Sequence, residues 1–333
     1  MINFLFWERN VVKMADTHKQ RFEKALRREK VTGHVPQFEL VFFLTMEAFG
    51  RVHPSHRQYS QWNQMSARER ELHLQDMADL YIQTARHYDH DAIFVHPNPG
   101  EMDDTRRLLE IIREKTGDEY FLMMHGDTTL AIPTGDEMME MSVKMYEDPD
   151  SLHDQQNRWM EKMEKVASTL SGTGLLDGFA LCSDYAFNVN PFFSPELFAE
   201  LVAPHLKECI DTYRSLGYYT IKHTDGNINP ILDQIVACGP DALHSIDPQG
   251  HMNLVEVRKK YGDRICTIGN VNCGLLQTGT EQEAIDDVHR CLREGMDGNY
   301  GFIFSTSNCA YTGMPLERYE LMQKIWREEA IYS

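Results

Sequence analysis

A histidine and an aspartate two residues apart, His223 and Asp225, directly follow an apolar run in the sequence. Side chains at positions i and i+2 of a strand point to the same side, so both can reach one bound species. Cys309, which follows a later apolar run, could add a thiolate to their nitrogen and oxygen. Three such ligands with a fourth position open suit a catalytic zinc ion. In the alternative interpretation, His223 and Asp225 form a hydrogen-bonded pair that holds a loop, and Cys309 is a small buried hydrophobe.

Other residue types that can bind metal ions or move protons also lie in or after apolar runs. They are Glu39, Glu47, His96, His125, Asp127, Asp184, Tyr185, Asp247, Asn270, Asn272 and Asn308. Carboxylates and imidazoles gathered at one place are typical of metal binding or acid–base catalysis. For Asn270 and Asn272, hydrogen bonding that orders a strand end is the simpler interpretation.

These residues need a scaffold that brings strand ends together, and the sequence repeats a short apolar run followed by a helix-like segment. The eight apolar runs are Gln37–Leu44, Asp91–His96, Tyr120–His125, Gly178–Cys182, Tyr218–His223, Ala242–Ile246, Arg264–Ile268 and Tyr300–Ser305. The helix-like segments are Glu69–His87, Asp103–Thr116, Asp150–Ser171, Pro195–Ser215, Pro230–Cys238, Leu254–Tyr261 and Glu281–Glu294. This alternation predicts an α/β fold in which eight parallel strands close into a (β/α)8 TIM barrel with all strand ends at one mouth. An open doubly wound sheet is the alternative, but no Gly-rich loop follows the first run, where Gly50 stands alone.

Composition and charge narrow the function classes. The chain of 333 residues has 51 acidic and 33 basic residues, an excess of 18 negative charges. Nucleic-acid binding is disfavoured, because phosphates are met by basic surfaces. No apolar run approaches the roughly 20 residues that span a bilayer, so we expect no membrane insertion. Seven scattered cysteines without a C-x-x-C pair, and no export signal, favour a reducing cytoplasm.

The domain organisation is expected to be simple. No linker, low-complexity segment or internal repeat divides the sequence. Because TIM barrels often exceed about 250 residues, we expect residues 1–333 to form one barrel domain with an N-terminal helical extension at about 1–33.

A series of motifs in a fixed order resembles the uroporphyrinogen decarboxylase superfamily over nearly the whole chain. The motifs are R-F-E-K-A-L at 21–26 followed by V-P at 35–36, S-P-E-L-F at 194–198, P-H-L-K at 204–207, H-T-D-G-N at 223–227, G-N-V-N at 269–272 and T-G-T-E at 278–281. Their order and spacing together make the resemblance specific. It implies a (β/α)8 barrel, in agreement with the alternation of strands and helices.

Three positions depart from the decarboxylases of this superfamily. Their stretch M-R-Q-A-G-R-x-x-P-x-x-R corresponds to residues 46–57 here, with Glu47 at the first arginine and Arg51 at the second. His96 stands where they have an aspartate, and Asn308 where they have a histidine. An anion in place of a carboxylate-binding arginine reverses the local interaction, so we do not expect decarboxylation of a porphyrinogen.

The chain is also similar to the cobalamin-dependent methyltransferases of the same superfamily, which bind zinc through an H-x-C pair and a later cysteine. His223 and Cys309 would take two of these positions, and Asp225 stands at the third. The resemblance thus implies zinc held by His223, Asp225 and Cys309. A carboxylate in place of a thiolate makes the zinc a stronger Lewis acid, suited to an ether or alcohol oxygen.

These observations lead to one expected function and several alternatives. We expect an O-demethylase-type methyltransferase that moves a methyl group from a small methoxylated or methylated compound to the cobalt of a transiently bound corrinoid protein. The catalytic candidates are His96, His125, Asp184 and Glu47, and the substrate-binding candidates are Tyr185, Arg51, Asn270 and Asn308. The alternatives are methyl transfer from cobalamin to a thiol, a metal-independent decarboxylase-like lyase that binds an acid through Arg51, and a corrinoid- or tetrapyrrole-binding protein without catalysis. For the oligomeric state, a homodimer is one of the alternatives.

Overall fold

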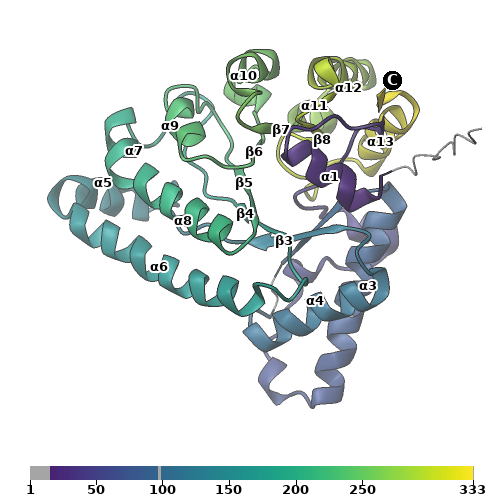
Figure 1. Ribbon diagram of the computed structural model, residues 1–333, viewed down its shortest axis with the longest axis horizontal. Coiled ribbons are helices and arrows are strands. Elements are labelled where there is room, and N and C mark those ends of the chain that lie inside the picture. Colours follow the sequence, from purple (N-terminus) through teal and green to yellow (C-terminus); the bar gives the residue numbers. More distant parts are fainter. Residues whose placement is uncertain (1–15, 97–98, 333) are drawn as a thin grey trace, which may run out of the picture.

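The computed structural model describes residues 16–96 and 99–332, which are built around a curled, seven-stranded parallel sheet (Figure 1). Its strands are β2 (Ala92–Val95), β3 (Phe121–His125), β4 (Gly178–Leu181), β5 (Tyr219–His223), β6 (Ala242–His244), β7 (Cys266–Val271) and β8 (Phe302–Thr306). They pair in chain order, each with the next. Every residue of β2, β4, β6, β7 and β8 is buried, because a parallel sheet is covered on both faces.

Helices connect the strands and surround the sheet. They are α1 (His18–Leu26), α2 (Thr45–Phe49), α3 (Ala67–Tyr88), α4 (Met102–Thr116), α5 (Glu137–Glu147), α6 (Pro149–Leu170), α7 (Pro195–Leu201), α8 (Ala203–Ser215), α9 (Leu232–Ala237), α10 (Leu254–Tyr261), α11 (Cys273–Thr278), α12 (Glu281–Gly295) and α13 (Leu316–Glu329). Short 3-10 helices are η1 (Pro54–His56), η2 (Trp62–Gln64), η3 (Pro248–Gly250) and η4 (Asp297–Asn299). Among the described residues, no helix is both long and apolar enough to cross a membrane.

The first predicted strand, Gln37–Leu44, is not a regular strand. The Phe304 amide donates to the Pro36 carbonyl (2.8 Å), and the Asp91 amide donates to the Gln37 carbonyl (2.8 Å), so this segment contacts both β8 and the start of β2. The Gln37 amide, however, donates to the Asp91 carboxylate (2.8 Å) and not to a backbone carbonyl of a neighbouring strand. Only isolated bridges to Phe304 and Ala310 result. The structure therefore shows an α/β fold with a curled sheet of TIM-barrel type, and full closure with eight strands stays a prediction.

The predicted helix-like segment Pro195–Ser215 is helical, but it is divided into two helices, α7 and α8. Ser194 caps α7 by accepting a hydrogen bond from the Leu197 amide (3.2 Å), and α7 ends at Leu201. Pro204 has no amide hydrogen to continue that helix, and it lies in the first turn of α8 instead.

Helix α1, in the predicted N-terminal extension, covers the amino ends of the strands. Phe22 packs against Phe38 and Phe121, with ring centroids 5.4 and 4.8 Å apart. A short antiparallel pair, β1 (Gly33–His34) with β9 (Ile331–Tyr332), joins the region after α1 to the C-terminal end. Residues 1–15 of the extension lie outside the described residues. With the amino ends covered, the carboxyl ends of the strands are where polar side chains gather.

Candidate active site

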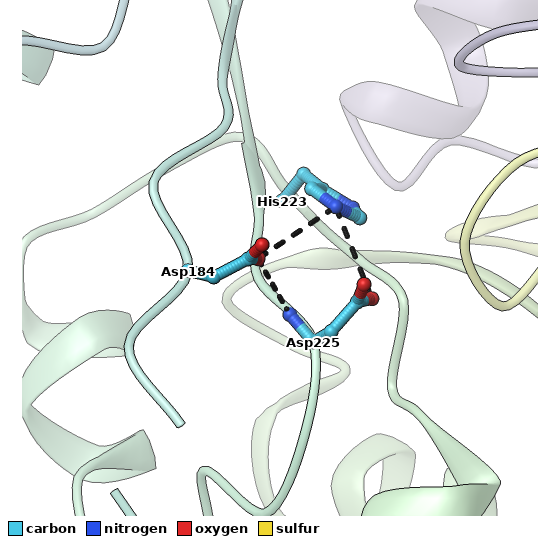
Figure 2. A group of neighbouring side chains, drawn as sticks. All are labelled: Asp184, His223 and Asp225. Atoms are coloured by element: carbon cyan, nitrogen blue, oxygen red, sulfur yellow. Dashed lines mark hydrogen bonds and ion pairs between the residues drawn. The ribbon is translucent and has the colours of Figure 1, made fainter. Parts of the chain in front are cut away.

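Three side chains at the carboxyl ends of β4 and β5 form a compact group (Figure 2). His223 is the last residue of β5, Asp225 follows it by two positions, and Asp184 follows β4. His223 Nε2 lies 3.9 Å from Asp184 Oδ1 and 3.8 Å from Asp225 Oδ1. One potential ligand atom of each residue lies within 4.8 Å of the other two. The parallel pairing of β4 with β5 brings these strand ends side by side.

The electrostatics of this group leave negative charge without a counter-ion. Burial lowers the pKa of His223 to about 4, so the imidazole is uncharged at neutral pH. Burial, followed by the charge of Asp184, raises the pKa of Asp225 to about 7. The Asp225 carboxylate accepts hydrogen bonds from Ser245 Oγ (2.6 Å) and from the side-chain amide of Asn308. These neutral donors do not cancel its charge.

A divalent cation fits this ligand set. One neutral imidazole and two carboxylates supply nitrogen and oxygen atoms of the kind that catalytic zinc sites use, with room for a further ligand. A cation placed between Asp184 and Asp225 would also remove the repulsion that raises the pKa of Asp225. The residues present therefore suit the zinc ion that the sequence predicts.

The structure brings two of the three predicted metal ligands, His223 and Asp225, together. It adds Asp184, which the sequence suggested as a catalytic residue. Cys309 is not part of this group. Its backbone carbonyl lies 3.7 Å from the Cys273 sulfur, and burial raises the pKa of the Cys309 thiol. The thiol is therefore protonated at neutral pH.

The predicted catalytic residues His96 and His125 lie beside one another at the ends of β2 and β3. Their ring centroids are 5.2 Å apart, and the Phe94 ring lies within 4.8 Å of both. Burial lowers the pKa of both imidazoles, that of His96 to about 3, so both are uncharged at neutral pH. His96 Nε2 is buried and has no hydrogen-bond partner among the described residues. This pair forms a polar but uncharged surface.

A third imidazole extends this surface. His53, whose ring centroid lies 5.5 Å from that of His96, is buried, and burial lowers its pKa to about 3. The Ser55 amide donates to His53 Nδ1 (3.3 Å), so the hydrogen of the uncharged ring is on Nε2.

Glu47 and Arg51 lie on or near α2. Glu47 is exposed in the first turn of this helix. Arg51 Nη2 donates to the Asp76 carboxylate (2.5 Å) and the Asp76 carbonyl (2.7 Å), and Arg57 also contacts this carboxylate. The guanidinium that the sequence suggested for binding an acid is thus held by an acid of the protein itself.

The three remaining substrate-binding candidates have hydrogen-bond partners within the protein. The Tyr185 hydroxyl is fully buried and lies 2.7 Å from Thr129 Oγ1. The Asn270 side chain donates to the Ile246 carbonyl (2.9 Å) and accepts from Arg290 (3.1 Å), which fits its ordering of a strand end. The Asn308 amide donates to Asp225. Of these three, only Asn308 contacts the candidate metal ligands.

Sequence reasoning missed two residues that support this group. His244, at the end of β6, has its Nδ1 2.7 Å from Nδ1 of His223. Ser245 Oγ donates to Asp225. The signal that could identify them is a histidine followed by a serine in the sixth apolar run, Ala242–Ile246.

Comparison with solved structures identifies proteins of similar fold. Its overall structure is similar to "methyltransferase from Methanosarcina mazei", with a TM-score of 0.70 and 19% sequence identity over 94% of this chain and 98% of the other. It is also similar to the GH5_18 protein from Streptomyces cattleya, with a TM-score of 0.50 and 11% identity over 90% and 82% of the two chains. At these identities the likeness shows the fold alone.

No curated protein matches the sequence. The sequence profile described as "Uroporphyrinogen decarboxylase (URO-D)" matches residues 124–329, which is more than half of the chain. The match includes β4 to β8 and all three members of the candidate metal group. The protein therefore belongs to the uroporphyrinogen decarboxylase family.

Proposed function

We propose that this protein is a corrinoid-dependent methyltransferase that takes a methyl group from a small methoxylated or methylated compound and passes it to the cobalt of a partner corrinoid protein. The observation that carries the proposal is the group of Asp184, His223 and Asp225, a ligand set for a Lewis-acidic metal at the carboxyl ends of the strands. The likeness in fold to a methyltransferase supports the same reaction class.

In this proposal, Asp184, His223 and Asp225 hold zinc, which when bound supplies a Lewis acid that withdraws charge from the oxygen of the methyl donor. The two carboxylates offset the charge of the ion, and Ser245 and Asn308 hold Asp225 in place. Cys309 follows Asn308 in the loop after β8 and lies outside this ligand group.

His96 and His125 orient the methyl donor. Negative charge develops on the leaving oxygen as the methyl group departs, and the N–H group of an uncharged imidazole can stabilise it by donating a hydrogen bond. The buried Phe94 ring packs edge-on against both imidazoles and holds them in place. Because both imidazoles are uncharged, they favour a neutral methoxy compound over a carboxylate.

The corrinoid comes from a partner, since a cobalamin is too large for the filled interior of a barrel and must approach over the loops at the strand ends. The contact is transient, because the partner must leave to deliver its methyl group.

The occupied state of Arg51 disfavours the lyase alternative. That reaction needs a cation to bind the acid, and the Arg51 guanidinium is already bound to Asp76. The thiol methyltransferase alternative would use the same metal ligands, but its methyl donor is methylcobalamin and its methyl acceptor is a thiol.

The test mixes the purified zinc-loaded protein with a reduced corrinoid protein and a panel of neutral methoxyarenes, and follows methylation of the cobalt by absorbance. We expect methylation with at least one donor, and a loss of about 100-fold or more in His223→Ala. Arg51→Met is the matched control and should keep the rate. No methylation with any donor, together with turnover of a small acid that Arg51→Met abolishes, would replace this proposal with the lyase.

A further inference from the structure

A second buried histidine, His244, lies beside the candidate metal ligands. His223 and His244 are direct partners in the parallel pairing of β5 with β6, so their side chains project from the same face of the sheet. Their ring centroids are 4.9 Å apart, and the two Nδ1 atoms are separated by 2.7 Å. A single hydrogen atom fits between two ring nitrogens at this distance, and the ring that carries it decides what His223 can bind.

The hydrogen can be assigned from the other side of His244. Its Nε2 lies 3.2 Å from the Thr306 carbonyl oxygen, which can only accept, so Nε2 carries a hydrogen. His244 is fully buried, and the described residues place no carboxylate in contact with its ring. A cationic imidazole there would lack a counter-ion, so Nδ1 of His244 carries no hydrogen and accepts one. Nδ1 of His223 is therefore the donor, and Nε2 of His223 keeps its lone pair.

That lone pair faces Asp184 and Asp225, at 3.9 and 3.8 Å. We propose that His244 is a positioning residue, which locks His223 in the tautomer that presents Nε2 to a divalent cation held between the two carboxylates. Hydrogen bonds of this kind, from the far nitrogen of a metal-binding histidine, fix ring orientation and raise ligand basicity. The inference rests on the metal site of the proposed function, but it concerns a residue outside the ligand set.

The acceptor for His244 is itself fixed. Thr306 donates its amide hydrogen to Glu39 Oε1 (3.1 Å) and its hydroxyl hydrogen to Glu39 Oε2 (2.8 Å), and the side chains of Glu39, Thr306 and His244 are all buried. Ser305 Oγ, 3.4 Å from His244 Nε2, can accept the same hydrogen. Glu39, Thr306 and His244 thus form a continuous chain of hydrogen bonds that ends at His223. This chain orients the ligand before the metal arrives.

Two substitutions separate the two hydrogen bonds of His244. In His244→Asn the side-chain oxygen can take the place of Nδ1 and accept from His223. In His244→Gln the amide nitrogen can take the place of Nε2 and donate to Thr306, but nothing stands at Nδ1. We expect His244→Asn to keep zinc affinity within about threefold, and His244→Gln to lose about 10- to 100-fold. A residue with a purely structural role would give the reverse order, since His244→Gln keeps the longer side chain and the Thr306 contact.

The experiment uses the full-length protein, first without metal. Nitrogen-15 NMR of labelled histidines reports which ring nitrogen of His223 carries hydrogen, with His223→Gln used to assign the signal. We expect hydrogen on Nδ1 in the unmodified protein and in His244→Asn, and loss of this preference in His244→Gln. Zinc affinity is then measured for all three proteins by competition with a chelator.

Hydrogen on Nε2 of His223 in the unmodified protein would overturn the inference, and so would equal zinc affinity in His244→Gln and the unmodified protein. If the variants do not fold, the tautomer of the unmodified protein still decides. Failure of the unmodified protein to bind zinc would instead contradict the proposed function, and the NMR result would judge the role of His244 separately.

Discussion

Lys222 and His223 are consecutive residues of β5 that project to opposite sides of the strand, and their surroundings differ in charge. Lys222 Nζ lies 2.8 Å from Asp127 Oδ2 and 2.8 Å from the Ser183 carbonyl, and it sits 4.0 Å from the centroid of the Tyr185 ring. Burial alone would raise the pKa of Asp127, but the charge of Lys222 holds it below its usual value. On this side, a buried anion and a buried cation match.

On the other side of the strand, His223 faces two carboxylates, and no lysine or arginine of the described residues forms an ion pair with them. The two sides also differ in exposure, because the Asp127 side chain is 8% exposed, against 48% for Asp184 and 22% for Asp225. A pair with matched charges and complete hydrogen bonds contributes to the structure, whereas an excess of one charge in a partly buried place costs stability unless a ligand neutralises it. The comparison therefore favours the unmatched side as the place where we propose that a cation binds.

The largest expected effect is on the matched side. Lys222→Met leaves the buried Asp127 carboxylate without its cation, so we expect a loss of about 3–5 kcal/mol in the free energy of unfolding. Urea denaturation measures it. The double variant Asp127→Asn/Lys222→Met is the control and should recover part of the loss. A change below about 1 kcal/mol in Lys222→Met would show that the pair is not a structural unit.

A pH titration of stability tests a second unmatched acid, Glu39. Burial raises its pKa to about 8, against hydrogen bonds from Thr306 that act in the opposite direction. Because the folded-state pKa lies above the unfolded value of about 4.5, the stabilising contribution is complete below pH 4.5 and disappears as the pH rises toward 8. Relative to Glu39→Gln, the unmodified protein should lose at most about 4 kcal/mol over this range. If the free energy of unfolding depended on pH in the same way in both proteins, the raised pKa of Glu39 would be contradicted.

A change on the unmatched side should have the opposite sign from Lys222→Met. In metal-free protein, Asp184→Asn removes a like charge near Asp225, so we expect the free energy of unfolding to stay equal or rise by up to about 1 kcal/mol. The effect is small because the Asp184 side chain is 48% exposed. Zinc affinity should nevertheless fall at least about tenfold, because a ligand is lost. Destabilisation of metal-free Asp184→Asn by more than about 1 kcal/mol would make Asp184 a structural residue.

The smallest expected effect is that of Cys309. Its sulfur is not part of the compact ligand group, so we expect Cys309→Ser to change zinc affinity by no more than about threefold, against at least tenfold for Asp225→Asn. Chelator competition measures both variants side by side. A loss in Cys309→Ser as large as that in Asp225→Asn would show that the thiol joins the metal when it binds, as the family resemblance implies.

Local patterns in the sequence predict most of the fold. The apolar run Tyr218–His223 corresponds closely to β5, and Asp91–His96 to β2, because each buried strand needs a continuous apolar segment. The first apolar run, Gln37–Leu44, does not form a regular strand, because the Asp91 side chain takes the hydrogen bond that the Gln37 amide would make within the sheet. The spacing of apolar residues in the sequence cannot predict this contact.

Only the part of the candidate site that comes from one short segment of the sequence can be predicted from the sequence. The i, i+2 spacing identifies His223 and Asp225, although β5 ends at His223 and Asp225 lies in the loop that follows it. Asp184 and His244 join them only through the pairing of β4, β5 and β6, and this register is a property of the tertiary structure. The neutral state of His96 and His125 likewise depends on burial against Phe94.

The most direct test of the central claim, that Asp184, His223 and Asp225 bind a divalent cation, is the zinc content and zinc affinity of the purified protein beside those of His223→Ala. We expect about one zinc ion per chain in the unmodified protein and none in His223→Ala, with similar urea denaturation curves for the two metal-free proteins. Equal zinc content in both proteins, or none in the unmodified protein after incubation with zinc, would contradict the claim.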